Sequence, residues 1–296
     1  MSMAKTILDE LMENSPVLLD GAWGTQLQAR GLAVGDSPER WNLTNPEAVT
    51  AVARAYAEAG SRIVLTNTFG GNRYILSAHG LEKEVSAINR NGVALTREGI
   101  GPGVAVFASL GPSGKLLSMG EADEEELAEV FREQVRGFVA GGANGVVVET
   151  MSDLAEAELA VRVAVESSLP VVACMSYSAG KDMDRTIMGI TPEAAADALL
   201  AAGASYVGAN CGNGAAQYAG VCGRLHKTSG RPVWLKPNAG VPEVVEGEVV
   251  YRTTPESFAR DAHALAAEGA GFLGGCCGTT PDHIRVLGAV LRGVGS

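Results

Sequence analysis

The stretch NPEAVTAVARAYAEAGSRIVLT, residues 45–66, decides the fold, because it joins one helix to one short buried strand. Asn45 is a residue type that caps helices, Pro46 suits the first helical turn, and Gly60 is a typical helix stop. The run Ile63–Thr66 that follows is short and rich in apolar residues, as expected for a strand buried on both faces of a parallel sheet. The stretch therefore predicts one helix–strand unit of an α/β fold.

This unit recurs along the whole chain. Eight short runs rich in Val, Ile and Leu are predicted as strands: Val17–Asp20, Ile63–Thr66, Val104–Ala108, Val146–Glu149, Val171–Met175, Tyr206–Asn210, Val233–Lys236 and Gly271–Gly274. Helical patterns lie between them, at 45–60, 123–142, 191–203, 254–269 and 280–291. Eight strands alternating with helices predict a (β/α)8 TIM barrel, with residues 1–296 as a single domain. An open doubly wound sheet is the alternative, because one sequence does not reveal strand order.

Composition narrows the class of protein. The chain has 296 residues, of which 46% are hydrophobic, so it can bury a large core. Its net charge of -11 comes without the basic stripe that a nucleic-acid or anionic membrane surface needs. We expect no signal peptide or membrane span and a cytoplasmic protein. Five cysteines, an odd number, indicate reduced thiols, and Cys174 and Cys222 are expected to pack in the core.

The barrel prediction gives the polar residues a location. Chemistry in such barrels takes place at the carboxyl ends of the strands. The residues at those ends are Asp20, Gly21, Thr66, Asn67, Thr68, Phe69, Ser109, Glu149, Thr150, Ser176, Tyr177, Asn210, Cys211, Lys236, Pro237, Asn238, Gly275, Cys276, Cys277 and Gly278. Three of the five cysteines are therefore expected to converge on one rim of the barrel.

The stretch GFLGGCCGTTPDH, residues 271–283, places two thiols side by side in a run of glycines. A disulfide between Cys276 and Cys277 would be strained, because adjacent residues do not reach the preferred geometry. Two adjacent thiolates and a third from Cys211 suit tetrahedral zinc with an open fourth position, as in catalytic sites. The spacing alone leaves ordinary buried cysteines equally open. The following TTPDH is predicted to be an ordinary helix start, with His283 on the surface.

Several motifs in order are similar to those of the homocysteine S-methyltransferase family. They are LLDGAWGTQLQARGL (18–32), TNTFGGNR (66–73), SLGPSG (109–114), VVVET (146–150), GANC (208–211), KPNAG (236–240) and GGCCGTTPDHI (274–284). The resemblance covers nearly the whole chain. Within the family, NTFGGN and PNAG are most similar to the homocysteine-binding module of cobalamin-dependent methionine synthase.

The resemblance implies an enzyme with one zinc ion, held by Cys211, Cys276 and Cys277. Homocysteine would supply the fourth ligand and be methylated to methionine. A free thiol, with a pKa near ~8.5, is a poor nucleophile at neutral pH, whereas zinc stabilises the thiolate.

The amino-acid part of homocysteine needs its own contacts. Glu149 is expected to hold the ammonium, with Asp20 as a second acceptor. Backbone N–H groups around Gly21 and Ala22 and the hydroxyl of Ser109 or Thr68 are expected to hold the carboxylate. By the same resemblance, Asn238 would approach the zinc when substrate is absent.

The methyl donor is left open between two classes. No folate- or cobalamin-binding module is expected within the 296 residues, which favours a separate methylcorrinoid protein as partner. The alternative is a small onium donor such as S-methylmethionine or betaine. The aromatic residues Trp23, Phe69, Tyr74 and Tyr177 are candidates to cradle its cationic methyl group.

Two alternatives belong to other functional classes. Lys236 ends a strand where barrel aldolases carry a Schiff-base lysine. A non-catalytic zinc or thiol sensor would instead need a closed site with four ligands. None of the four histidines falls at a predicted strand end, so the sequence offers no evident fourth ligand and favours the open site.

Overall fold

The computed structural model describes residues 6–245 and 248–293, and a sheet of eight parallel strands lies at its centre. The strands are β1 (Val17–Leu18), β2 (Ile63–Leu65), β3 (Ala105–Leu110), β4 (Gly145–Met151), β5 (Val171–Met175), β6 (Tyr206–Cys211), β7 (Val233–Pro237) and β10 (Ala270–Leu273). All eight predicted strands are confirmed, with ends that differ by at most two residues. Ser109 and Glu149 thus lie within strands rather than after them.

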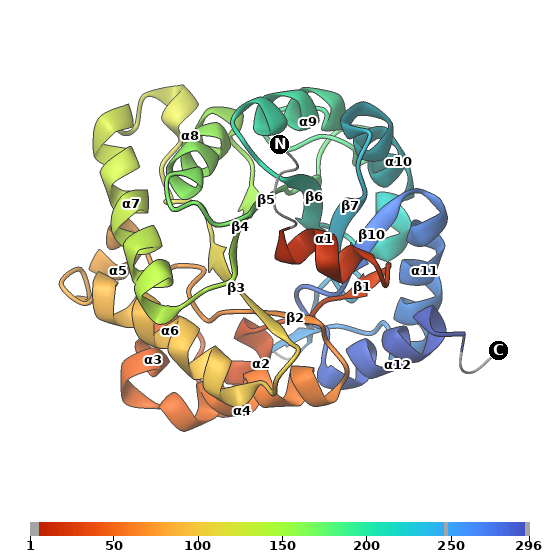
Figure 1. Cartoon of the computed structure of the whole chain (residues 1–296), viewed down its shortest axis with the longest axis horizontal. Helices are drawn as coiled ribbons and strands as arrows, with labels where there is room; N and C mark the ends of the chain where they lie inside the picture. Colours follow the sequence, from red (N-terminus) through yellow and green to blue (C-terminus); the bar gives the residue numbers. More distant parts are fainter. Residues whose placement is uncertain (1–5, 246–247, 294–296) are drawn as a thin grey trace.

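The sheet closes on itself. Its strand order is β1-β10-β7-β6-β5-β4-β3-β2, and the two outer strands meet through a parallel bridge between Leu19 and Ile63. The backbone N–H of Arg62 also donates to the carbonyl of Leu18 at 2.7 Å. Figure 1 shows the resulting ring of strands inside a ring of helices. The barrel is confirmed, and the open-sheet alternative is wrong because an open sheet leaves its outer strands apart.

Twelve α-helices appear among the described residues. They are α1 (Ile7–Met12), α2 (Gly24–Gln28), α3 (Trp41–Thr44), α4 (Pro46–Glu58), α5 (Arg73–Ser77), α6 (Val85–Gly99), α7 (Glu124–Gly141), α8 (Leu154–Val165), α9 (Pro192–Ala201), α10 (Tyr218–Ser229), α11 (Pro255–Ala267) and α12 (Pro281–Leu291). The five predicted helices are α4, α7, α9, α11 and α12. Asn45 precedes α4, but its side chain makes no capping hydrogen bond. None of the helices in residues 6–245 and 248–293 is long and apolar enough to cross a membrane.

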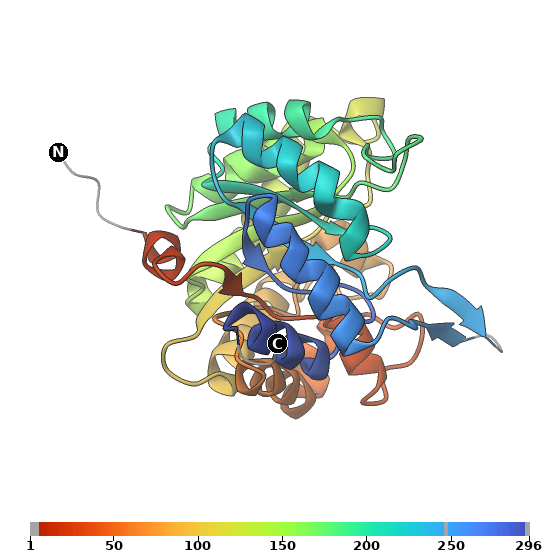
Figure 2. The same cartoon turned by 90° about the vertical axis from the view of Figure 1, so that its right-hand side faces the viewer.

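The amino-terminal end of the barrel is filled and covered by apolar side chains. Leu8 and Leu11 of α1 pack in one cluster with the inward-facing residues of the strands. At its centre the rings of Trp234 and Phe272 lie 5.2 Å apart. Figure 2 shows α1 at this end of the molecule. The other end, where the strands finish, is left for the site.

A short antiparallel hairpin projects from that other end, as Figure 2 also shows. It consists of β8 (Glu243–Val245) and β9 (Glu248–Val250), between β7 and α11. The sequence reading did not predict it. Its valines are exposed, unlike the apolar residues of the barrel strands: Val244 and Val249 are 75% and 62% exposed.

Candidate metal and substrate site

A cavity of about 340 Å³ opens at the carboxyl ends of the strands. Strand-end residues, residues of α2 and the segments beside α2 line it. The lining residues are Gly21, Ala22, Trp23, Gly24, Thr25, Gln28, Pro38, Glu39, Leu65, Thr66, Asn67, Phe69, Ser109, Glu149, Thr150, Cys211, Lys236, Gly275, Cys276 and Cys277. The cavity therefore joins the predicted cysteines to several predicted substrate residues.

The three predicted cysteines converge. Cys211 ends β6, and Cys276 and Cys277 follow β10, yet their sulfur atoms all lie within 4.8 Å of one another. Sulfurs about 2.3 Å from a tetrahedral zinc lie roughly 3.8 Å apart. The Sγ atoms of Cys211 and Cys276, now 3.1 Å apart, would separate slightly around the ion. No fourth His, Cys, Asp or Glu joins this group in the described part of the chain, so the set fits an open three-thiolate zinc site.

The protons of these thiols are unevenly held. Hydrogen bonds from the thiols of Cys211 and Cys276 lower the pKa of Cys277 to about 3. The pKa of Cys211 is raised, because its hydrogen bonds to the other two thiols and its burial favour the protonated form. One thiolate is therefore favoured in the metal-free cluster, which prepares it for a cation. The remaining cysteines, Cys174 and Cys222, are buried among apolar residues as predicted.

Two strand ends beside the cysteines have a strained backbone. Thr150 and Cys211 have φ angles of 62° and 63°, which non-glycine residues rarely adopt. Each such residue costs about 1–3 kcal/mol and tends to occur at functional sites. The pairing of β4 with β5 also shifts register between Val148 and Met151, as at a β-bulge. The irregular backbone thus coincides with the cavity.

Glu149 presents a buried carboxylate to the cavity. Its Oε1 accepts a hydrogen bond from Ser109 Oγ at 2.5 Å, and its Oε2 accepts one from Asn210 Nδ2 at 3.3 Å. Burial raises the pKa of Glu149 to about 7, although the nearby Lys236 lowers it. A cation placed here would stabilise the ionised carboxylate.

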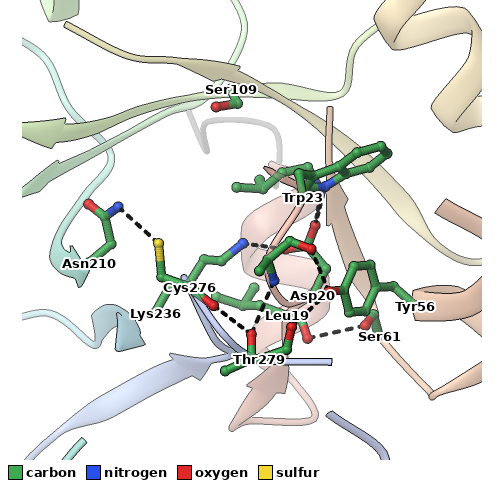
Figure 3. Close-up of polar contacts among 12 residues, drawn as sticks. Leu19, Asp20, Trp23, Tyr56, Ser61, Ser109, Asn210, Lys236, Cys276 and Thr279 are labelled. Atoms are coloured by element: carbon green, nitrogen blue, oxygen red, sulfur yellow. Dashed lines mark hydrogen bonds and ion pairs between the residues drawn. The ribbon is translucent and has the colours of Figure 1, made fainter. Parts of the chain in front are cut away.

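Asp20 and Lys236 form a buried ion pair, which Figure 3 shows beside Trp23 and Cys276. The second oxygen of Asp20 accepts hydrogen bonds from Trp23 Nε1 at 3.0 Å and from the backbone N–H of Leu65 at 2.8 Å. Burial lowers the pKa of Lys236, but the charges of Asp20 and Glu149 outweigh it and the net shift is upward. A Schiff-base lysine must be neutral to attack, so this pairing argues against the aldolase alternative.

Thr279 is a site residue that the sequence reading missed. Its hydroxyl accepts a hydrogen bond from the N–H of Ala22 at 3.1 Å and donates to the carbonyl of Cys276 at 2.7 Å (Figure 3). A Cβ on Gly21 would lie 2.7 Å from this hydroxyl, so only glycine fits there. The loop after β1 is thereby fastened to the cysteine loop, and TTPDH is more than a helix start. The N–H of Ala22, one of the backbone groups predicted to hold the substrate carboxylate, is already bonded to Thr279.

Three of the predicted substrate residues, Asp20, Thr68 and Asn238, are not among the residues that line the cavity. Thr68 is fully buried and donates its hydroxyl hydrogen to the carbonyl of Ser109 at 2.7 Å. Asn238 donates through Nδ2 to the carbonyl of Gly212 at 2.6 Å, whereas its Oδ1 has no partner among the described residues. The backbone N–H of Asn238 donates to the carbonyl of Cys211 at 3.2 Å, which keeps it beside the cysteines.

Two of the four aromatic candidates border the cavity. Trp23 and Phe69 line the cavity, but Tyr74 and the fully buried Tyr177 do not.

The prediction that His283 lies on the surface is wrong, because this residue is only 7% exposed. Its Nδ1 accepts from the N–H of Thr280 at 3.2 Å, and its Nε2 donates to the carbonyl of Thr253 at 2.9 Å. His283 therefore fastens the start of α12 rather than facing solvent.

Comparisons with known proteins agree with this geometry. A family model described as homocysteine S-methyltransferase matches residues 17–291. The chain is 30% identical, over 97% of its length, to methionine synthase of Mycobacterium leprae (strain TN). It is 31% identical, over 98% of its length, to that of Mycobacterium tuberculosis (strain ATCC 25618 / H37Rv). It spans about a quarter of these relatives, 25% and 26% respectively.

A solved structure with the same fold is the metallated form of the homocysteine methyltransferase MmuM from Escherichia coli. The TM-score is 0.80 at 23% identity, and the match covers 96% of this chain and 99% of that one. At this identity the likeness shows a shared fold.

Proposed function

Because the chain belongs to the homocysteine S-methyltransferase family, we propose that it is a zinc-dependent enzyme that methylates homocysteine to methionine. One observation carries this proposal: three thiols within 4.8 Å of one another border the same cavity as the buried carboxylate of Glu149. A thiol substrate with an ammonium group matches both features. Residues 1–296 would form one homocysteine-binding zinc methyltransferase barrel with a cytoplasmic location.

The proposed metal ligands are Cys211, Cys276 and Cys277. Zinc bound there would hold the substrate sulfur as a thiolate at the open fourth position. A sulfur lone pair then forms the new S–CH3 bond, while the donor keeps the electron pair of the bond that breaks. The three ligands come from two separate segments of backbone, and the Thr279 hydroxyl holds the second segment in place.

The proposed substrate contacts follow from what borders the cavity. Glu149 is assigned to the ammonium, and its contact with Ser109 Oγ orients the carboxylate. Asp20 is a weaker candidate than the sequence alone implied, because both of its oxygens are engaged. For the substrate carboxylate, Gly21 and Ser109 border the cavity and Thr68 does not.

Asn238 is proposed to place its free Oδ1 near the metal when substrate is absent. The support is that this buried oxygen has no partner among the described residues, although the adjoining Nδ2 is bonded. An unpaired buried oxygen is costly, and a metal ion would satisfy it.

A methylcorrinoid protein is the proposed methyl donor. The similarity to two methionine synthases supports it, because there the matching region is part of a much longer protein. A small onium donor is the alternative, supported by Trp23 and Phe69 at the cavity. Turnover with homocysteine and methylcobalamin or a methylated corrinoid protein, set against S-methylmethionine and betaine, separates the two donors.

Metal analysis combined with Cys277→Ser tests the core of the proposal. We expect one zinc per chain in the wild type, with metal and activity both lost in the variant. Full activity in metal-free or Cys277→Ser protein would overturn the proposal. Zinc binding without turnover for any donor would instead support the sensor alternative.

A further inference from the structure

Asn210, the residue before Cys211, touches both halves of the proposed site. Its side chain is buried, with 1% of the residue exposed. Its Oδ1 accepts a hydrogen bond from the backbone N–H of Thr150 at 2.7 Å. Because a backbone N–H can only donate, this contact fixes the orientation of the amide. The NH2 end must therefore face Glu149 and the thiols.

That NH2 group has more acceptors than hydrogens. Within 4.0 Å of Nδ2 lie Thr150 Oγ1 at 2.6 Å, Glu149 Oε2 at 3.3 Å, Cys211 Sγ at 3.7 Å and Cys276 Sγ at 4.0 Å. Figure 3 shows the last of these contacts. Once Thr150 Oγ1 accepts from Asn210, its own hydrogen is free to point at Cys211 Sγ, 3.9 Å away. One amide thus reaches a carboxylate and two sulfurs, directly or through Thr150.

We propose that Asn210 is a positioning residue that couples the ammonium-binding carboxylate to two of the metal-binding thiolates. The inference rests on the proposed roles of Glu149 and the cysteines. Donation to a ligating sulfur withdraws charge from it, and such bonds strengthen when the acceptor is ionised. In a buried site these contacts are stronger than in water.

The strained backbone fits this role. The left-handed conformation at Thr150 lies within the register shift between β4 and β5, where its N–H leaves the regular ladder. Asn210 Oδ1 receives that N–H instead. Cys211, the residue after Asn210, also has a left-handed conformation, so two residues with this backbone adjoin the contact between Asn210 and Thr150. Both unusual conformations therefore meet at this amide.

The experiment measures metal binding by Asn210→Ala without substrate. We expect its zinc affinity, from competition with a chelator, to fall about 10–100-fold. With Co²⁺ in place of zinc, the thiolate-to-metal charge-transfer band should move to longer wavelength, because sulfurs that lose donors release charge more easily. The homocysteine KM should also rise in this variant, whereas Glu149→Gln should raise KM and leave the zinc affinity and the cobalt spectrum unchanged.

Asn89→Ala is the matched control. Asn89 is equally buried, but its amide donates to the carbonyls of Gly71 and Val85. Losing it removes a buried amide elsewhere in the fold, so zinc affinity and the cobalt spectrum should stay as in the wild type. The same change in both variants would show a general packing effect and overturn the inference.

The remaining outcomes separate this inference from the proposed function. Wild-type affinity and spectrum in Asn210→Ala would overturn the coupling role and leave the methyltransferase proposal intact. Failure of the wild type to bind zinc or cobalt would overturn both. If Asn210→Ala does not fold, Thr150→Val and Thr150→Ser provide the test, because only serine keeps the hydroxyl that faces Cys211. Equal cobalt spectra for these two variants would overturn the inference that Asn210 acts on Cys211 through the Thr150 hydroxyl.

Discussion

The two ends of the barrel differ in what their side chains can do. At the amino-terminal end, α1 covers a cluster of apolar residues centred on Trp234 and Phe272. At the other end the same strands finish in thiols, the Asp20–Lys236 pair and strained backbone. Buried charges and strain cost free energy, whereas apolar packing supplies it. Stability and chemistry are therefore separated along one barrel axis, so a substitution at one end should change one of the two without the other.

The largest effect is expected at the apolar end. Trp234→Ala should lower the free energy of unfolding by about 3–5 kcal/mol, because it leaves a cavity in a filled interior. Urea unfolding measures this loss, and metal analysis of the folded variant should still find one zinc per chain. Loss of zinc from folded protein would show that the two ends are not separable.

The converse change is made at the polar end. Cys276→Ser should remove nearly all zinc and lower activity at least ~100-fold, because outer contacts alone are worth 10–100-fold. The free energy of unfolding of the metal-free protein should change by less than about 1 kcal/mol. Cys222→Ser in α10 is the control and should keep its zinc. Equal zinc in the two variants would contradict the assignment of the cluster.

A third change separates substrate binding from metal binding at the polar end. Glu149→Gln should raise the homocysteine KM about 10–100-fold with a smaller effect on kcat, because it removes the charge that is proposed to hold the ammonium. Steady-state kinetics and zinc analysis measure both. Glu156→Gln is the matched control, since Glu156 is also buried but does not border the cavity. An unchanged KM in Glu149→Gln would remove Glu149 from the site.

The smallest effect is a dependence of stability on pH. The folded-state pKa of Glu149 is about 7, above its ordinary value of 4.5, so the folded state holds this proton more tightly than the unfolded state. The stabilisation is complete below pH 4.5 and is lost as pH rises through 7. Between pH 5.5 and 8, metal-free wild type should lose on the order of 2 kcal/mol relative to Glu149→Gln. The same difference in free energy of unfolding between wild type and Glu149→Gln at both pH values would refute this.

The sequence predicted the barrel because its signals are local. Each strand is a short apolar run, and because the strand ends share one rim, the sequence also predicts that Cys211 lies near Cys276 and Cys277. The hairpin that carries the exposed Val244 and Val249 was not predicted, because its two strands pair with each other outside the barrel sheet and lack a buried face.

The polar partnerships were missed because they join distant residues. Asp20 and Lys236 are 216 positions apart, and Ala22 and Thr279 are 257 apart. No periodicity in the chain connects such pairs. The sequence predicts Asn210 at a strand end beside Cys211, but it does not show that the amide of Asn210 contacts both Glu149 and the thiols. Side-chain hydrogen bonds of this kind depend on distances that only the closed barrel sets.

The covering of the barrel by α1 has a kinetic consequence. With Leu8 and Leu11 closing one end, the described part of the chain offers the thiols access from the opposite side. Two reactants that share one entrance must arrive in turn. Under the proposed function, homocysteine would enter first, because its sulfur would have to reach the thiols, and a donor seated above it would hinder its escape. The covering by α1 together with the proposed function therefore predicts a compulsory order of binding, with homocysteine first, which product-inhibition patterns would test.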